Sequence, residues 1–109
     1  MKAELRKYNQ SPRKVRLVTD LVKGKTVPEA LKALSFLPKR AAEPVQKLIE
    51  SAVANAKALG GLTNDDVAAL KVKAISVDSD GMMVRYMPRA MGRATVIRRK
   101  KSRVKVVLA

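Results

Sequence analysis

Two short segments among the last forty residues of the sequence limit the possible folds most strongly. Residues 70–78 and 103–108 alternate apolar and polar side chains with a period of two, which is typical of a strand buried on one face. The apolar parity slips near residues 74–75, and such a slip predicts a β-bulge. We therefore predict two strands and ask what the chain between them can form if they pair antiparallel.

The stretch between these strands is a connection of about 24 residues, which is unusually long for a structureless loop in a compact domain. A helix is disfavoured because Gly81, Pro88 and Gly92 leave no uninterrupted run of useful length. We predict instead that both strands continue outward as a long hairpin with its turn near residues 88–92. Each limb beyond residue 79 would reach roughly 30 Å at about 3.3 Å per residue.

Basic residues far outnumber acidic ones in this chain, and the acidic ones are unevenly distributed along it. The 24 lysines and arginines exceed the 9 acidic residues by 15 charges, and all of the acids lie at or before Asp80. A net charge this large on a small domain predicts a polyanionic partner, nucleic acid first and an anionic membrane second. A basic surface that serves only solubility is the alternative, but it would not require a segment from which every acid is missing.

The sequence argues against an enzyme and against a cofactor. It contains no cysteine and no histidine, which removes disulfides, thiolate ligands and the usual general base near neutral pH. The only close acid pairs are residues 65–66 and the pair Asp78 and Asp80, and both have the composition of turns. The start has no signal-peptide pattern and no segment has the length of a membrane span, so we expect a cytoplasmic protein.

The first sixty residues predict a short edge strand and three helices. The strand covers residues 3–9, and the first helix covers residues 12–23, with Ser11 as its N-cap and a stop at Gly24. Thr26 and Glu29 have the spacing of a capping box for a second helix that ends near Phe36. The predicted buried face of these two helices consists of Val15, Val18, Leu21, Val22, Ala30, Leu31, Leu34 and Leu37.

The third helix has the clearest pattern and ends at residues 60–61, which are both glycine. Its start is open, because Pro44 either lies near the first turn or kinks a longer helix. We interpret residues 60–69 as a loop. The predicted buried face of the helix consists of Val45, Leu48, Ile49, Ala52, Val53, Ala56 and Leu59.

The residue types in the basic segment indicate how it would bind a nucleic acid. Arginine outnumbers lysine there, which suits bidentate phosphate contacts and predicts steeply salt-dependent binding. The only aromatics are Tyr8, Phe36 and Tyr86, and we expect Phe36 in the core, so there is no aromatic platform for single-stranded bases. We therefore expect recognition of the backbone and shape of structured RNA or DNA. The flanking charge makes a core position unfavourable for Met82, Met83, Met87 and Met91.

Four motifs carry a family resemblance. They are SPRKVRLV (residues 11–18), LVKGK (21–25), ESAVANA (50–56) and above all MPRAMGRA (87–94). In this order they closely resemble bacterial large-ribosomal-subunit protein number twenty-two (the uL-twenty-two family) over essentially the whole chain. The resemblance implies an α+β fold in which three helices pack on a small antiparallel sheet with a long protruding β-hairpin. It also implies a monomer that helps to assemble the large subunit, with a body at 1–78 and 102–109 and a hairpin at 79–101.

The resemblance also implies partners and site residues. The partners are large-subunit ribosomal RNA and neighbouring ribosomal proteins, with nascent peptide and macrolide antibiotics near the hairpin. The hairpin tip, which lines the peptide exit tunnel, would consist of Met83, Val84, Arg85, Pro88, Arg89, Met91, Gly92 and Arg93. The residues that bind ribosomal RNA would be Arg13, Lys14, Arg16, Lys23, Lys25, Lys39, Arg40, Arg85, Arg89, Arg93, Arg98, Arg99, Lys100, Lys101 and Arg103.

One other class of protein combines a helical body with basic, proline-tipped arms. DNA-bending architectural proteins of the histone-like kind have this plan. They usually dimerise and carry a tip motif of their own, which this sequence lacks. We keep this class as the alternative to a ribosomal protein.

Overall fold

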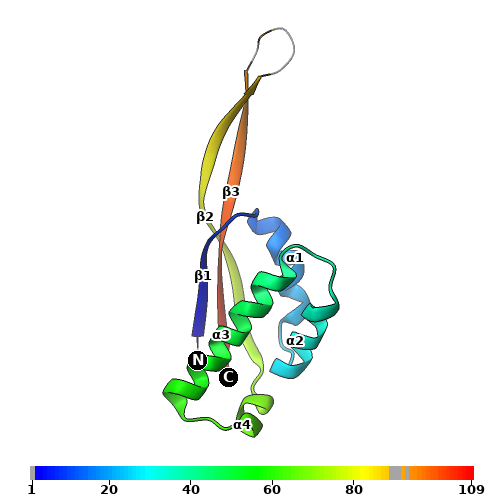
Figure 1. The fold of residues 1–109 in the computed structure, drawn as a ribbon, viewed down its shortest axis with the longest axis vertical. Coiled ribbons are helices and arrows are strands. Elements are labelled where there is room, and N and C mark those ends of the chain that lie inside the picture. The colour runs from blue at the N-terminus through cyan, green and yellow to red at the C-terminus, as the bar shows by residue number, and fades with distance from the viewer. Residues whose placement is uncertain (1, 89–91, 93) are drawn as a thin grey trace.

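The computed structural model of the chain describes residues 2–88, 92 and 94–109. Helices cover one face of a three-stranded antiparallel sheet, and two of the strands extend far beyond them (Figure 1). The predicted α+β class with a small antiparallel sheet is therefore confirmed, and the turn predicted near residues 88–92 lies largely outside the described residues. In chain order the elements are β1 (Lys2–Tyr8), α1 (Pro12–Val22), α2 (Val27–Phe36), α3 (Ala42–Gly60), α4 (Asn64–Ala69), β2 (Val72–Pro88) and β3 (Ala94–Leu108).

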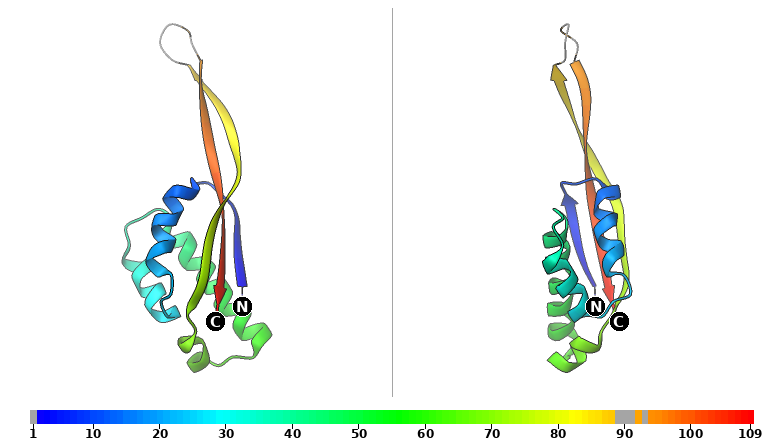
Figure 2. Two further views of the ribbon diagram at one scale, coloured as in Figure 1. Left: turned by 180° about the vertical axis from the view of Figure 1, so that it is seen from behind. Right: turned by 90° about the vertical axis from the view of Figure 1, so that its right-hand side faces the viewer.

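The sheet has the order β1-β3-β2. It has three strands only in the half nearer the two chain termini, called the lower half here (Figure 1). Strand β1 pairs with β3 from Lys2 opposite Val107 to Tyr8 opposite Ser102. Strand β2 pairs with β3 further, up to Pro88 opposite Ala94. Beyond Ser102 the sheet is thus a two-stranded ribbon, whose strands twist around each other above the body (Figure 2). This ribbon, residues 82–88 and 94–101, is called the arm below, and it contributes to the elongated shape of the molecule, which is 63 Å long and 26 Å wide.

The pairing of β2 with β3 is interrupted at two positions. The first register shift lies between Val72 and Ala74, which confirms the predicted bulge near residues 74–75. The second lies between Ser79 and Met82, where Gly81 has a φ of 89°. The interpretation of residues 78–81 as a turn was wrong, because they form a bulge inside β2. Bulges and turns both favour glycine at a left-handed position, so composition alone does not separate them.

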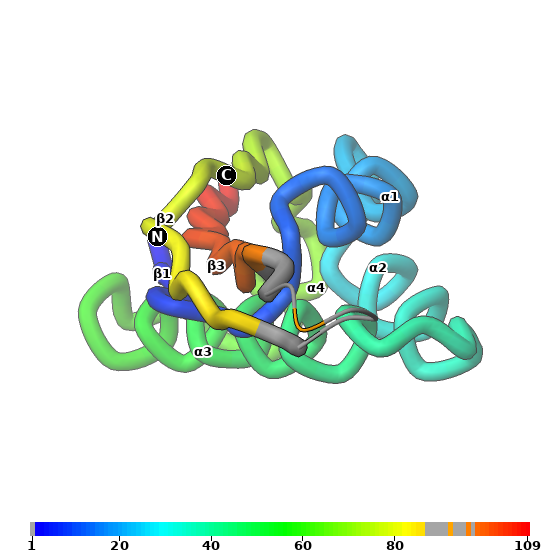
Figure 3. The backbone as a smooth tube through the Cα atoms, turned by 90° about the horizontal axis from the view of Figure 1, so that it is seen from above, coloured from blue at the N-terminus to red at the C-terminus, as the bar shows by residue number. Residues whose placement is uncertain are grey.

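The core lies between one face of the sheet and the helices. Along β3 the buried residues alternate, since Ser102, Val104, Val106 and Leu108 are buried and the residues between them are not. Viewed along the arm, α3 runs along one side of the body, with α1 and α2 next to it (Figure 3). Buried residues of these three helices complete the core, among them Val15, Val18, Val22, Ala30, Leu34, Val45, Leu48, Ile49 and Ala52.

Three apolar residues assigned to the core lie at the surface instead. Phe36 is 78% exposed, Leu59 89% and Leu21 48%. Phe36 follows the buried Leu34 by two residues, and a helix turns by about 200° over that distance, so the ring faces outward. Leu59 lies in the last turn of α3 beside Lys2, at the margin of the sheet. On α1, Thr19 and not Leu21 faces the core together with Val18, and Thr19 is 2% exposed.

The ends of the helices correct two further expectations. Thr26 is the N-cap of α2, but its side chain makes no capping hydrogen bond, so the predicted capping box is absent. The backbone of this segment is instead bonded to the start of β2, because the Val27 N–H donates to the Leu70 carbonyl and the Val72 N–H to that of Lys25. A capping box does form at Thr63 and starts α4 within the segment interpreted as a loop.

The open question at the third helix is settled by its first residue. Helix α3 begins at Ala42, which puts Pro44 in its first turn. The N–H groups of the first turn have no partner within a helix, so a proline there costs no hydrogen bond.

Candidate nucleic-acid interface

The basic residues meet in a groove where the arm leaves the body. The groove has a volume of about 580 Å³, and seven of its eleven lining residues are lysine or arginine, while none is acidic. This junction groove brings together parts of the chain that are far apart in sequence. Its lining residues are Asn9, Gln10, Ser11, Lys14, Arg40, Met83, Arg85, Arg98, Arg99, Lys100 and Lys101.

One wall of the junction groove is the connection between β1 and α1. The fully buried Ser102 donates its hydroxyl to the carbonyl of Gln10 at 2.5 Å, which fixes this connection against β3. The Lys14 N–H donates to the carbonyl of Ser11 at 3.1 Å and starts α1 there. Helix α1 has no acid in its first turn, so neither its dipole nor its side chains oppose an anion in the groove.

The last acidic residue of the chain, Asp80, accepts hydrogen bonds at the base of the arm. Asp80 accepts a hydrogen bond from the Lys7 N–H at 2.6 Å and one from Nη2 of Arg103 at 3.0 Å. Glu4 lies on the other side of Arg103, with Oε1 3.2 Å from Nε. The Lys7 N–H lowers the pKa of Asp80 most, and the Arg103 charge lowers it further against an opposing effect of desolvation. These carboxylates fasten β1 to the hairpin and leave the junction groove without an anion of its own.

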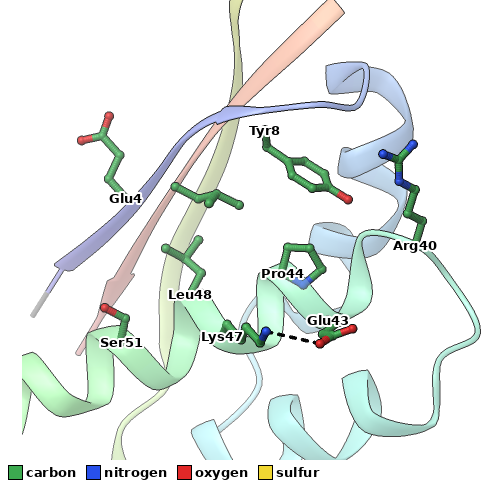
Figure 4. A pocket seen from close by; sticks show the side chains of 9 residues that line it. Glu4, Tyr8, Arg40, Glu43, Pro44, Lys47, Leu48 and Ser51 are labelled. Carbon is green, nitrogen blue, oxygen red and sulfur yellow. Dashed lines mark ion pairs between the residues drawn. The ribbon is translucent and has the colours of Figure 1, made fainter.

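A second hollow lies between β1 and α3 and has mixed charge (Figure 4). It measures about 530 Å³, and Tyr8 points into it from β1 toward Arg40 (Figure 4). Glu43 forms an ion pair with Lys47 at 3.3 Å on its floor. Because Glu4 and Glu43 both line it, this hollow is less suited to a polyanion than the junction groove.

Two structural observations limit other kinds of site. Among residues 2–88, 92 and 94–109, no three His, Cys, Asp or Glu side chains come together in a way that could hold a metal ion. Within the same part of the chain, no helix is long and apolar enough to cross a membrane.

Comparison with known proteins identifies the family of the chain. The family model described as ribosomal protein L22p/L17e matches residues 3–109. The chain belongs to this family.

Similar proteins from three bacteria cover almost the same length. The protein of Pelobacter propionicus is 50% identical over 107 residues, which are 98% of this chain and 94% of that protein. That of Myxococcus xanthus is 52% identical over 109 residues, covering 98% and 93%. That of Bdellovibrio bacteriovorus is 50% identical over 108 residues, covering 99% and 96%. Each of these relatives is named large ribosomal subunit protein uL22.

In this member of the L22p/L17e family, two predicted site residues are engaged within the protein. Arg16 donates from Nη2 and Nε to the carbonyl of Val77, at 2.7 and 3.2 Å, and so ties α1 to β2. Arg103 is held by Glu4 and Asp80. Neither arginine lines the junction groove, and their contact with RNA stays a prediction.

The other residues that were predicted to bind RNA or to form the hairpin tip lie in different parts of the molecule. Lys14, Arg40, Arg85 and residues 98–101 line the junction groove. Arg13 and Lys39 are exposed on the body, as are Lys23 and Lys25 at the far end of α1, about 15 Å from Pro12 by helix rise. Of the predicted tip residues, Arg89, Met91 and Arg93 lie outside the described residues.

Two parts of the groove were not predicted from the sequence, namely the polar connection at residues 9–11 and the position of Met83. Residues 9–11 carry no charge, and a search for cations passes over them. Their signal is an Asn-Gln-Ser run between a strand and a helix that starts with proline, since such a run offers free backbone groups at a helix start.

Proposed function

We propose that this chain is a structural constituent of the large ribosomal subunit in the cytoplasm, and that it binds large-subunit ribosomal RNA through the junction groove and the arm. The observation that carries the proposal is the groove, in which seven cations from four separate parts of the chain converge without an acid. Membership of the L22p/L17e family and the names of the relatives support the assignment to this subunit.

The physical basis of binding is neutralisation of phosphates. Each phosphate that a lysine or arginine neutralises releases condensed counterions, which makes affinity fall steeply with salt. Arg85 and Arg98 add planar guanidinium groups that match two phosphate oxygens at once. We propose that the exposed Arg13, Lys23, Lys25 and Lys39 extend the contact over the surface of the body.

We propose further that the body and the arm have separate parts in assembly. The body, with its own core, would dock on the RNA surface, and the arm would reach between RNA helices until its tip lines the peptide exit tunnel. The 63 Å length of the molecule against a width of 26 Å suits a protein that connects distant RNA segments. Neighbouring ribosomal proteins, the nascent peptide and macrolide antibiotics are the further partners of this proposal, and the role is structural, not enzymatic.

Footprinting of assembled large subunits tests the two parts separately. Subunits would be reconstituted with the full chain and with a chain that lacks residues 82–98, and RNA protections would be compared. We expect the body's protections to persist in the deletion variant and those near the exit tunnel to disappear. A full chain that protects duplex DNA better than ribosomal RNA would contradict the proposal and favour a DNA-bending protein.

A further inference from the structure

The arm carries an exposed apolar column next to a cationic one, on a single face. In an antiparallel pair, directly opposite residues have their side chains on the same face. Met82 lies opposite Lys100, Val84 opposite Arg98, and Tyr86 opposite Val96, with no register shift between them. One face of the arm therefore has Met82, Val84 and Tyr86 along β2, and Lys100, Arg98 and Val96 along β3. We call it the two-column face.

This face is the outward continuation of the buried face of the sheet. Along β3 the residues two apart are Val106, Val104 and Ser102, all fully buried, followed by Lys100 and Arg98, both exposed. On β2 the exposed fractions are 51% for Met82, 46% for Val84 and 72% for Tyr86, and Val96 on β3 has 49%. The helices that cover this face in the body stop below the arm (Figure 1). The apolar column thus remains open for an external partner.

We propose that the two-column face binds an unpaired, extended segment of the RNA, with bases against the apolar column and phosphates along the cationic one. This inference rests on the proposed RNA-binding function and names the form of RNA that the arm takes. A nucleotide combines an apolar base face with an anionic phosphate, and the two columns offer the matching groups side by side. Tyr86 supplies a ring on which a base stacks, Met82 a polarisable sulfur and Arg98 a guanidinium plane.

Double-stranded RNA and protein partners fit this face less well. A duplex keeps its base faces inside the stack and presents phosphates and 2′-hydroxyls, so it leaves Val84 and Tyr86 without a partner. An apolar peptide would cover the apolar column but would place nothing anionic on Arg98 and Lys100. The arm has no acid to neutralise them, since the last acid of the chain is Asp80. The charge of the face therefore favours a nucleic acid over a peptide, and its apolar column favours a single strand over a duplex. For the arm this replaces the expectation from the sequence that only the backbone and shape of structured RNA are recognised.

Binding of the full chain to an oligouridylate and to an RNA duplex tests the inference. We expect Tyr86→Ser to weaken oligouridylate binding roughly ten-fold, as for the loss of one base–aromatic stack, with little change for the duplex. Because this variant removes no charge, the salt dependence should stay the same. Arg98→Gln should instead reduce the slope of log affinity against log salt by about 0.7 on the oligouridylate.

Two control variants make this outcome specific. Tyr86→Phe keeps the ring and should bind as the unaltered chain does. Phe36→Ser removes an aromatic ring that is 78% exposed on the body, and it should leave oligouridylate binding unchanged. Equal losses for Tyr86→Ser and Phe36→Ser, or equal losses on oligouridylate and duplex, would overturn the inference.

Binding to large-subunit ribosomal RNA separates this inference from the function on which it rests. If the unaltered chain does not bind that RNA, the proposed function fails. If the unaltered chain binds that RNA tightly and Tyr86→Ser changes the affinity for neither the oligouridylate nor the duplex, only the inference about the two-column face fails. A photo-crosslinker at position 86 in assembled subunits gives an independent test, because crosslinks to RNA support the inference and crosslinks to protein alone overturn it.

Discussion

The body and the arm are built from the same two strands but are held together differently. In the body the even-numbered residues of β3 from Ser102 to Leu108 are covered by helices, and β1 adds a third strand. In the arm the same face carries Arg98 and Lys100, both exposed, and the ribbon has two strands only. A two-stranded ribbon is marginal in water on its own. Burial therefore stabilises the lower half of the hairpin, and we expect the upper half to be stable only when a partner binds it.

The largest expected effect compares two valines on the same face of β3. Val106 is fully buried and Val96 is 49% exposed. We expect Val106→Ala to lower the free energy of unfolding by about 2 to 3 kcal/mol, because it removes buried methyl groups and leaves a cavity. Val96→Ala should change it by no more than about 0.5 kcal/mol. Urea denaturation measures both, and similar losses for the two variants would show that the arm has a core of its own.

The second prediction concerns RNA affinity instead of stability, and here the substitutions in the arm should have the larger effect. Replacing Arg85, Arg98 and Arg99 by glutamine should leave stability nearly unchanged, because all three are exposed. Affinity for large-subunit ribosomal RNA should fall at least about ten-fold, and the salt slope should decrease by about 0.9 for each phosphate that is no longer neutralised. Filter binding at several salt concentrations measures this.

A matched variant tests whether the position of these charges matters. Lys57, Lys71 and Lys105 are exposed on the body, away from the junction groove. Their replacement by glutamine removes the same total charge and should reduce affinity much less. An equal loss in both triple variants would mean that the RNA responds to net charge and not to the groove.

The third prediction concerns the hydrogen bond that fixes one wall of the groove. Ser102→Ala leaves the Gln10 carbonyl without its donor, which should cost about 1 kcal/mol of stability. Ser79 lies directly opposite Ser102 in the register but is exposed, so Ser79→Ala should have little effect. Thermal unfolding of both variants measures the difference. Equal effects would mean that the connection at residues 9–11 is held by other contacts.

The sequence predicted the long-range features of this fold better than its local ones. Period-two alternation at 70–78 and 103–108, with Pro88 and Gly92 between, was enough to predict the hairpin and one of its bulges. This succeeded because every alternative required an unusually long loop or a broken helix. The same kind of reasoning failed at Thr26 and in the segment that forms α4. At Thr26 the local capping pattern competes with backbone pairing to the start of β2, which a single sequence does not reveal. At α4 the opposite happened, because a local capping box of Thr63 and Asp66 starts a helix in a segment too short to show a helical pattern.

The candidate site was predicted in composition but not in arrangement. The charge pattern and the family resemblance implied Lys14, Arg40 and the cations of the arm as RNA-binding residues, yet not their convergence in one groove. They also could not separate Arg16 and Arg103, whose guanidinium groups contact protein oxygens, from the arginines that face outward. That distinction depends on which carbonyl or carboxylate lies within reach after folding. Tyr86 shows the same limit, because its place beside Val96 follows from strand register and not from sequence spacing.

The smallest expected effect is the contribution of Asp80 to the junction between body and arm. Its pKa is lowered from 3.8, first by the hydrogen bond from the Lys7 N–H and further by the charge of Arg103. A lowered pKa in the folded state gives stability that is fully present above the unfolded value and is lost as pH falls through the folded one. The body should therefore lose part of its stability as the pH falls below about 4.

Asp80→Asn should flatten that loss, because asparagine does not titrate. Asp20→Asn, at an exposed position of α1, serves as the control and should retain the acid dependence of the unaltered chain. Urea denaturation at several pH values measures stability, and amide exchange of Lys7 reports on the hydrogen bond itself. We expect the Lys7 amide to exchange faster in Asp80→Asn, since a neutral amide oxygen accepts more weakly than a carboxylate. If exchange at Lys7 and the acid dependence are both unchanged, Asp80 does not fasten β1 to the hairpin, and the boundary between body and arm must be maintained by Ser102 and the buried residues below it.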